Sequence, residues 1–217
     1  MDDKTLIATR VAQELRPGTL VNLGIGLPTL VARLVPRDAN IFFQSENGIV
    51  GMQSVPEEGL EADDLTDAGG SPISALPGAA TFDSAMSFGL IRGGHLDVTV
   101  LGGLQVDRLG RLANWTVPGS MVPGMGGAMD LVTGARRVIV AMTHTAKGRP
   151  KIVDVCTLPL TSERRVDLIV TELAVMEPTA EGLILRELAP GLDIERVQRV
   201  TDTRLIMAGH VPFMALP

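Results

Sequence analysis

Short apolar runs alternate with helical segments along most of the chain, and glycine or proline separates one segment from the next. Residues 96–101 and 137–142 are typical of these runs, because they are long enough for a buried strand and too short for a helix. Helical spacing of apolar residues occurs just before the first of these runs, at residues 84–91. Strands that alternate with helices form a mainly parallel sheet covered on both faces. The sequence therefore predicts an open α/β sheet with some antiparallel pairs toward the C-terminus, where residues 173–176 and 183–188 form a hairpin.

The first half of the chain contains both regular and irregular parts of this pattern. Asp3 can cap a first helix that Pro17 stops, and Pro28 suits the first turn of a second helix that Pro36 closes. Residues 50–80, by contrast, hold glycine, proline and aspartate at short intervals, so we expect a long functional loop there. The other predicted elements are strands at 19–23, 40–44, 152–156 and 166–171, a turn at 107–110, and helices at 128–133 and 194–200.

Size and charge narrow the possible functions. With 217 residues, the chain can bury a large core and fits a single domain, residues 1–217, better than two small ones. A net charge of −6 with scattered basic residues predicts no binding to nucleic acid and none to an anionic membrane. The acidic N-terminus and the lack of an apolar run of about 20 residues lead us to expect a soluble, cytoplasmic protein.

Cysteine and histidine provide few candidates for chemistry. The single cysteine, Cys156, excludes a disulfide framework, and its apolar neighbours predict a buried strand position for it. His95, His144 and His210 are too far apart in sequence to indicate a local metal site, and a structural or surface position is expected for each.

Residues 43–51 place Glu46 at the end of an apolar, strand-like run and directly before a glycine turn. Rigid backbone on one side, with Gly48 and Gly51 on the other, presents such a carboxylate to a ligand that approaches closely. From composition alone, an ordinary turn with Glu46 in solvent explains the same residues, because Asn47-Gly48 readily supplies a positive φ. Glu46 is therefore a candidate nucleophile whose assignment depends on the rest of the chain.

Two glycine-rich turns are further candidates for ligand binding. Residues 124–127 precede a short helix, and successive N–H groups in such a turn can bind an anion, although a turn without a ligand fits the local sequence too. Residues 24–26 begin like a dinucleotide-binding fingerprint, but Thr29 stands where its third glycine is required, so a plain strand-to-helix turn near the site is expected. Without a Walker A sequence, a Gly-x-Ser-x-Gly elbow or a His-x-x-x-His pair, phosphate transfer, serine hydrolysis and zinc proteolysis lose support.

Taken together, these segments resemble the B (beta) subunit of the 3-oxoacid CoA-transferase family. The stretches that carry the resemblance are residues 21–28, 43–51, 76–79, 91–95, 112–115, 124–131 and 156–161. The likeness runs from about residue 3 to about residue 210 in one order, and it implies the layered α/β fold of that family. The chain has Ser120 and Pro123 where some members have lysines, and Thr81 where some have an aromatic residue, and these positions bear on the choice of substrate.

The resemblance also implies the chemistry of the site. It identifies Glu46 as the nucleophile that forms a covalent glutamyl-CoA thioester while CoA passes from an acyl-CoA donor to a short-chain or 3-oxo acid. It identifies the Gly127 amide as an oxyanion donor. The residues expected to bind the CoA substrate are Gly24, Gly26, Asn47, Gly48, Gly124 and Gly126. The CoA thioester is a substrate, so no cofactor and no metal are expected.

The same resemblance implies a partner. A separate A subunit is expected to complete the site, in a heteromer of two A and two B subunits, with a role in the breakdown of ketone bodies or aromatic acids. Arg92 and Arg111 are the cations considered for a dicarboxylate donor such as succinyl-CoA. Two other functions stay open: hydrolysis of acyl-CoA by the same glutamate, and acyl-CoA sensing without catalysis. Release of free CoA without an acceptor acid distinguishes the first, and the intact motif around Glu46 counts against the second.

Overall fold

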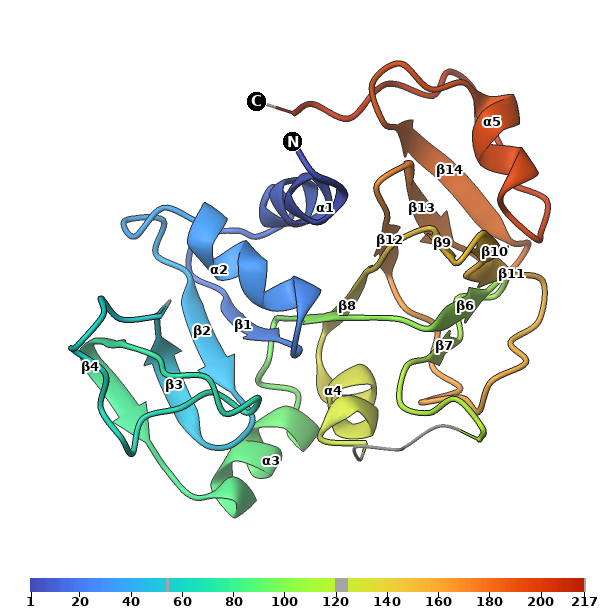
Figure 1. Cartoon of the computed structure of the whole chain (residues 1–217). Helices are drawn as coiled ribbons and strands as arrows, with labels where there is room; N and C mark the ends of the chain where they lie inside the picture. The colour runs from blue at the N-terminus through green and yellow to red at the C-terminus, as the bar shows by residue number, and fades with distance from the viewer. Residues whose placement is uncertain (54, 120–124, 217) are drawn as a thin grey trace.

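The structure is a computed structural model and describes residues 1–53, 55–119 and 125–216. The strands of its large sheet are β1 (Leu20–Leu23), β2 (Phe42–Ser45), β3 (Ile49–Met52), β4 (Ala75–Thr81), β5 (Val98–Leu101), β8 (Arg137–Ala141), β12 (Leu168–Val170), β13 (Ala174–Pro178) and β14 (Leu183–Leu188). Within the described residues they lie in the order β14-β13-β12-β8-β5-β1-β2-β3-β4 (Figure 1). The central strands from β12 to β2 are parallel, and antiparallel strands flank them at both ends.

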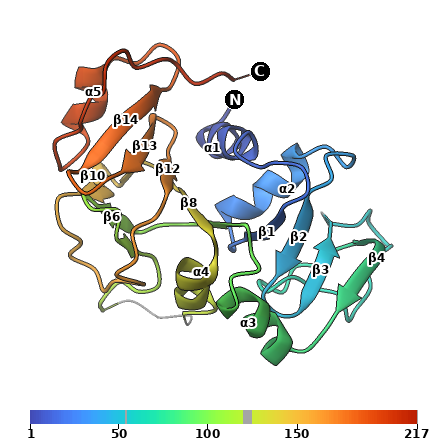
Figure 2. The same ribbon diagram turned by 180° about the vertical axis from the view of Figure 1, so that it is seen from behind.

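Helices cover both faces of this sheet. They are α1 (Asp3–Ala12), the 3-10 helix η1 (Leu27–Leu30), α2 (Val31–Leu34), α3 (Ser84–Arg92), α4 (Ala128–Gly134) and α5 (Ile194–Arg199). Figures 1 and 2 show α1 and α2 on one side of the central strands and α3 and α4 on the other. Successive side chains of a strand point to opposite faces, and in β8 Ile139 packs in the core with α1 whereas Val140 packs in the core with α3 and α4. The predicted open α/β sheet with helices on both faces is confirmed.

The predicted helix starts and stops need small corrections. Asp2, not Asp3, caps α1, because its carboxylate accepts the backbone N–H of Thr5 (N to O 3.0 Å). The helix ends at Ala12 rather than running on to Pro17. Pro28 does lie in the first turn of η1, where its missing N–H has no partner to lose.

The prediction of a loop throughout residues 50–80 is wrong at both ends of that range. β3 pairs antiparallel with β2, and β4 pairs antiparallel with β3, so antiparallel strands occur near the N-terminal half as well as toward the C-terminus. Gly51 has a φ of +88° where the pairing of β2 with β3 shifts register, which is the geometry of a β-bulge. β4 is an edge strand, where a sheet tolerates residues such as Pro77 and Gly78 more readily than in its interior.

A smaller unit packs beside the C-terminal end of the large sheet. Its strands are β6 (Gln105–Asp107), β7 (Leu112–Ala113) and β11 (Ile152–Val153), and β9 (Thr145–Ala146) pairs with β10 (Arg149–Pro150) next to them. The predicted turn at 107–110 connects β6 to β7, and the predicted hairpin of β13 and β14 is confirmed. Cys156 lies beyond β11 and is half-buried, so its predicted strand position is wrong. Burial nevertheless raises the pKa of its thiol to about 12, which leaves it a poor nucleophile.

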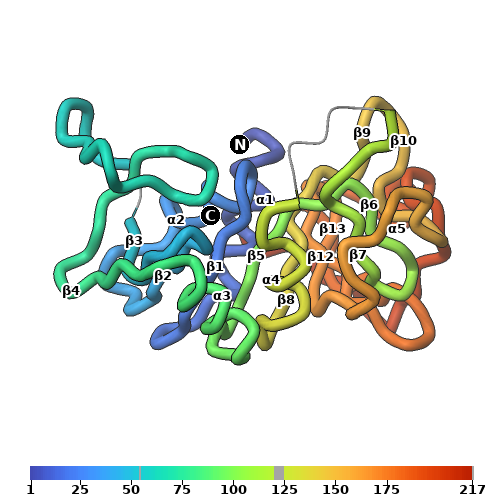
Figure 3. The backbone as a smooth tube through the Cα atoms, turned by 90° about the horizontal axis from the view of Figure 1, so that it is seen from below, coloured from blue at the N-terminus to red at the C-terminus, as the bar shows by residue number. Residues whose placement is uncertain are grey.

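The chain ends close to where it begins. Both termini lie beside α1 in Figures 1 and 2, and the side-chain amide of Gln13 donates to the carbonyl oxygen of Ala215 (N to O 2.6 Å). Figure 3 shows β2, β3 and β4 at one end of the molecule and α5 with β9 and β10 at the other. In the part of the chain that the structure describes, no helix has the length and apolar character needed to cross a membrane.

Candidate active site

Glu46 occupies the tip of the tight hairpin between β2 and β3. The three residues that connect these strands are Glu46, Asn47 and Gly48, and the N–H of Gly48 closes the turn by donating to the carbonyl oxygen of Ser45 (3.0 Å). Because β2 is parallel to β1 and β5, this tip lies at the edge where the carboxyl ends of the central strands meet. Ligands of open α/β sheets bind at that edge.

Two neighbouring segments, residues 66–68 and the residue after β4, hold the hairpin tip in place. The Ser45 hydroxyl accepts the N–H of Ala68 (2.9 Å), and the Asn47 side-chain amide donates to the carbonyl oxygen of Thr66 (2.8 Å). Gly48 accepts the N–H of Phe82 (2.9 Å) and has a φ of +124°, and a Cβ at this position would overlap the Phe82 carbonyl oxygen. Only glycine fits there, so this contact fixes how far the hairpin can lie from β4.

Glu46 reaches across to the start of α4. The backbone N–H of Gly127 donates to Glu46 Oε1 (N to O 2.8 Å), although the two residues are 81 positions apart in sequence. A Cβ on Gly127 would lie 3.0 Å from Cδ and Oε1 of Glu46, and one on Gly126 would lie 3.2 Å from Oε1. The glycines therefore let the carboxylate approach the backbone closely. The structure thus brings together the two residues predicted as catalytic.

Burial and charge act on Glu46 in opposite directions. Removal from water raises the pKa of its carboxyl group, the N–H of Gly127 works against this, and the negative charge of Asp130 adds to the rise. Asp130, in the first turn of α4, is itself paired with Arg92 at the end of α3 (Nε to Oδ1 2.6 Å). The Arg92 guanidinium also lies 5.5 Å from the centre of the Phe88 ring. Arg92 is thus paired with Asp130, and its side chain is 67% exposed.

The glycines predicted to bind CoA differ in position. Gly24 follows β1 and donates its N–H to the carbonyl oxygen of Val100 (2.8 Å). β1 is the neighbour of β2, at whose end the hairpin tip lies. Gly26 precedes η1 with a φ of +91°, and a Cβ added there would meet nothing within 4 Å. Gly126 lies beside Glu46, whereas Gly124, with Ser120 and Pro123, falls outside the described residues. CoA binding by these glycines, and by Asn47 and Gly48, stays a prediction.

The other residues considered for chemistry or binding lie in structural positions or at the surface. His144 is fully buried between the hydroxyls of Thr171 and Thr201 (2.9 Å each), and burial lowers its pKa to about 4, so it is neutral. His95 and His210 are exposed, which confirms the prediction for all three histidines. The second cation considered, Arg111, pairs with the buried Asp107 (2.8 Å). Within residues 1–53, 55–119 and 125–216, no group of three or more His, Cys, Asp or Glu side chains is arranged to hold a metal ion.

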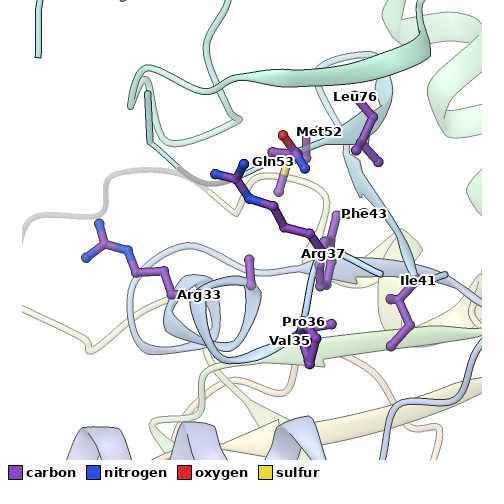
Figure 4. A pocket seen from close by; sticks show the side chains of 10 residues that line it. Arg33, Val35, Pro36, Arg37, Ile41, Phe43, Met52, Gln53 and Leu76 are labelled. Atoms are coloured by element: carbon purple, nitrogen blue, oxygen red, sulfur yellow. The ribbon is translucent and has the colours of Figure 1, made fainter. Parts of the chain in front are cut away.

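A separate pocket of about 230 Å³ lies between α2 and the outer strands (Figure 4). Arg33, Arg37 and Gln53 carry its polar groups, and Phe43 and Met52 are among its apolar residues. Phe43 points into the core shared with α1, on the opposite face of β2 from Gln44. This pocket is therefore on the other face of the sheet from the Glu46 site.

Asp130 is a neighbour of Glu46 that sequence reasoning missed. A carboxylate in the first turn of a helix and an arginine in the last turn of another are both common for reasons of helix dipole alone. Only the close packing of α3 on α4 brings Arg92 to Asp130 and both toward Glu46. No local spacing could have revealed it.

Comparison with known proteins places this site in a family. Residues 4–199 match the model of a protein family described as Coenzyme A transferase. The chain is 57% identical over 212 residues to the beta subunit of acetate CoA-transferase from Escherichia coli K12, which covers 97% of each protein. It is 49% identical over 197 residues to the B subunit of succinyl-CoA:3-ketoacid coenzyme A transferase from Helicobacter pylori 26695, covering 90% of this chain and 95% of that one.

Solved structures share the fold at lower identity. The apoenzyme of the acyl-CoA transferase YdiF from Escherichia coli O157:H7 matches 98% of this chain with a TM-score of 0.77 and 24% identity, and the match spans 43% of the YdiF chain. Glutaconate coenzyme A-transferase from Acidaminococcus fermentans matches with a TM-score of 0.73 and 19% identity, covering 100% of this chain and 90% of that one. A decarboxylase, AibA/AibB, also matches with a TM-score of 0.71 and 21% identity, covering 99% of this chain and 89% of that one. The fold alone therefore does not decide the reaction.

Proposed function

Because the chain belongs to the coenzyme A transferase family, we propose that it is the B (beta) subunit of a two-subunit enzyme that transfers CoA between short-chain or 3-oxo acids. Relatives named for acetate, for succinyl-CoA with 3-ketoacids and for 3-oxoadipate all match nearly full length, which favours this class of substrates. Glu46 is the nucleophile. The observation that carries the proposal is its carboxylate, half-buried at the carboxyl edge of the sheet and held by a backbone N–H.

The reaction divides into two half-reactions on that carboxylate. In the first, Glu46 Oε2 attacks the carbonyl carbon of the donor thioester, and CoA thiolate leaves to give a mixed anhydride. The thiolate then attacks Cδ of Glu46 and releases the donor acid as a carboxylate. The product is a glutamyl-CoA thioester. In the second half-reaction the acceptor carboxylate attacks Cδ, and the released thiolate then attacks the acceptor carbonyl, which restores the Glu46 carboxylate and frees the new acyl-CoA.

One amide can serve several of these steps. The N–H of Gly127 donates to Oε1 in the resting site, which leaves Oε2 to attack the donor thioester. When thiolate or acceptor attacks Cδ, the negative charge of the tetrahedral adduct develops on the oxygen that this N–H already contacts. A donor fixed in place before the reaction stabilises that charge without reorganisation, and such a donor contributes about 10²-fold to 10³-fold in rate.

The raised pKa of Glu46 fits this role. A carboxylate that is partly removed from water is a stronger base and a stronger nucleophile than one in bulk solvent, yet the N–H of Gly127 favours its ionised form. Glu46 can thus be anionic when it attacks and neutral in the thioester, with no net charge left in the site by the intermediate.

A partner subunit completes the proposal. The relatives at 47–57% identity carry the designation B or beta, so each is one part of a larger enzyme. We expect an A subunit to cover the carboxyl edge around Glu46, to exclude water from the thioester and to supply further substrate contacts. Two A and two B subunits are the proposed assembly, and the cytoplasm is the proposed location.

The test is exchange between acyl-CoA and acid by the chain assembled with its A subunit. We expect parallel lines in double-reciprocal plots for a panel of short-chain acyl-CoA donors and 3-oxo acids, since product leaves before the second substrate binds. The purified chain alone is expected to be inactive. Glu46→Gln should abolish exchange and keep its thermal midpoint. Release of free CoA without an acceptor at the rate of exchange would instead identify a hydrolase, and binding without turnover would identify a sensor.

A further inference from the structure

A row of buried polar side chains crosses the sheet at the level of Gln44, two residues before Glu46. Gln44, Asn22 and Thr99 are register partners on the adjacent strands β2, β1 and β5, and each is 0–1% exposed. Asn22 Nδ2 donates to Gln44 Oε1 (2.7 Å), and the Thr99 hydroxyl donates to Asn22 Oδ1 (3.3 Å). Gln44 precedes Glu46 by two residues, so both side chains start from the same face of the sheet.

The row continues into a helix. Gln44 Nε2 donates to the hydroxyl of Ser87, which is 0% exposed in the middle of α3 (2.9 Å). The last turn of α3 carries Arg92, which binds Asp130 of α4 (2.6 Å). α4 follows Gly127, whose N–H returns to Glu46 (2.8 Å). The contacts therefore form a closed circuit that leaves β2 at Gln44 and comes back two residues later at Glu46.

Packing makes this circuit stiff. α3 and α4 touch so closely that a Cβ on Gly134 would overlap the carbonyl oxygen of Ile91. The position of α4, and with it the Gly127 N–H, is therefore set by the position of α3. On β2, the residue that holds α3 in place is Gln44, through the hydrogen bond from its side-chain amide to the Ser87 hydroxyl. A shift of α3 relative to β2 changes the distance between the Gly127 N–H and the Glu46 carboxylate.

The polar row is unusual for its place. On the same face of the sheet, two residues along from Asn22 in β1 and from Thr99 in β5, Leu20 and Leu101 pack in the apolar core with α3 and α4. Burying amide and hydroxyl groups is favourable only if all their hydrogen bonds are made, and apolar side chains of similar size would fill the space without that condition. What hydrogen bonds add is a defined geometry, because they have a preferred length and direction that apolar contacts lack.

We propose that Gln44 and Ser87 are positioning residues for the nucleophile, which hold α3, and through it the start of α4, at the distance from β2 that places the Gly127 N–H on Glu46 Oε1. This inference rests on the proposed role of Glu46. Neither Gln44 nor Ser87 contacts substrate, since both are fully buried. Their effect is on the geometry of attack, for which a displacement of about 1 Å costs on the order of 10²-fold in rate.

The test compares three substitutions in the chain assembled with its A subunit. Gln44→Met keeps the length of the side chain and removes its bonds to Asn22 and Ser87, and Ser87→Ala removes only the last bond. Thr201→Val is the matched control, because it deletes another buried hydroxyl, 2.9 Å from His144 and just after α5, outside the contacts that connect Gln44 to Glu46. We expect kcat to fall by about 10²-fold in Gln44→Met and about tenfold in Ser87→Ala, with KM within about twofold of the original. Thr201→Val should lower thermal stability alone.

A second readout does not depend on turnover. The charge that acts on Glu46 is that of Asp130 on α4, which is paired with Arg92 on α3, and neither residue is changed by these substitutions. Loss of the Gly127 N–H removes a contact that favours the ionised carboxylate, so the Glu46 titration should move to higher pH in Gln44→Met and Ser87→Ala. Carbon-13 NMR of glutamate-labelled protein, with the signal assigned by its loss in Glu46→Gln, measures this shift.

The outcomes separate the two proposals. If the unsubstituted enzyme exchanges CoA but both variants keep its kcat and its Glu46 titration, the positioning role is wrong and the proposed function stands. If the unsubstituted complex has no activity, the proposed function fails, and the titration alone decides the positioning role. A titration that moves equally in Thr201→Val overturns the positioning role, since a general loosening of the fold then explains the effect.

Discussion

At the scale of a single residue, the ionisation of Glu46 predicts how activity depends on pH. Its carboxyl pKa is raised, first by burial and then by the charge of Asp130, and the attacking form is the carboxylate. Activity is therefore lost as pH falls through the folded-state pKa, and the acid limb of kcat/KM should lie above the usual value for glutamate, about 4.3. Asp130→Asn removes the like charge and should move this limb to lower pH. A limb that stays in place in Asp130→Asn would contradict this electrostatic account.

Gly127 offers a second residue-scale prediction. Its φ of −85° is accessible to alanine, but a Cβ would lie 3.0 Å from the Glu46 carboxyl carbon, closer than ordinary contact. Gly127→Ala should therefore fold normally and lower kcat by about 10²-fold, because the carboxylate is displaced from its donor. Gly89→Ala is the control, since nothing lies within 4 Å of the added methyl group in the middle of α3. Steady-state kinetics and circular dichroism on both variants test the prediction, and equal activity would contradict it.

Individual residues show what sequence can and cannot predict about the site. Glu46 was identifiable as a candidate because a strand-like run and a glycine turn flank it locally. Its pairing with Gly127 came only from the family resemblance, since no local signal connects residues so far apart in the chain. The roles of Asp130 and Ser87 were missed, because each depends on how two helices pack on each other and on the sheet.

At the scale of elements, the β2–β3 hairpin depends on Gly48. A Cβ there would overlap the Phe82 carbonyl oxygen, and its φ of +124° is unfavourable for other residues. Gly48→Ala should therefore lower both thermal stability and activity, because the hairpin tip must move. Gly78→Ala in β4 is the matched control, with a φ of +88° but nothing within 4 Å of the added methyl. It should lose about 1 kcal/mol of stability and keep its kcat. Equal kinetic effects in the two variants would count against the hairpin contact.

Strands β3 and β4 show why elements are missed in sequence. A bulge at Gly51 interrupts the two-residue period of β3, and β4 combines Pro77 and Gly78 with small residues and is largely exposed. Neither strand presents the alternating or continuous apolar run from which strands are predicted. The central strands were predicted well because helices cover both of their faces, which favours apolar residues at most positions, as in β5 and β8.

At the scale of the whole molecule, an ion-pair cluster joins the two ends of the chain. Arg10 of α1 is 7% exposed and binds both Glu14 and Glu187 of β14 (2.7 Å each), and Glu14 also binds Arg137 of β8. Arg10→Met leaves the two carboxylates without this partner and should reduce the free energy of unfolding by about 3 kcal/mol. Arg186→Met, which breaks an exposed pair with Glu177, is the control and should cost less than about 1 kcal/mol. Urea denaturation measures both, and equal losses would contradict the role of the cluster.

The molecule as a whole is built to present one edge of its sheet. Five parallel strands end at that edge, two cores hold them from either side, and the hairpin tip with Glu46 lies at the end of β2. The alternation of strands and helices predicted this architecture from sequence. The partner subunit was expected only from the family resemblance, and relatives named as subunits of CoA-transferases support it.

The central claim is that Glu46 becomes covalently bound to the sulfur of CoA during turnover. The most direct measurement is reduction of the enzyme with borohydride after incubation with an acyl-CoA and no acceptor acid, followed by mass spectrometry of its peptides. We expect reduction of the Glu46 side chain to an alcohol, one per active site, and none in protein incubated without acyl-CoA. Modification of a different residue, or full exchange activity in Glu46→Ala, would contradict the account.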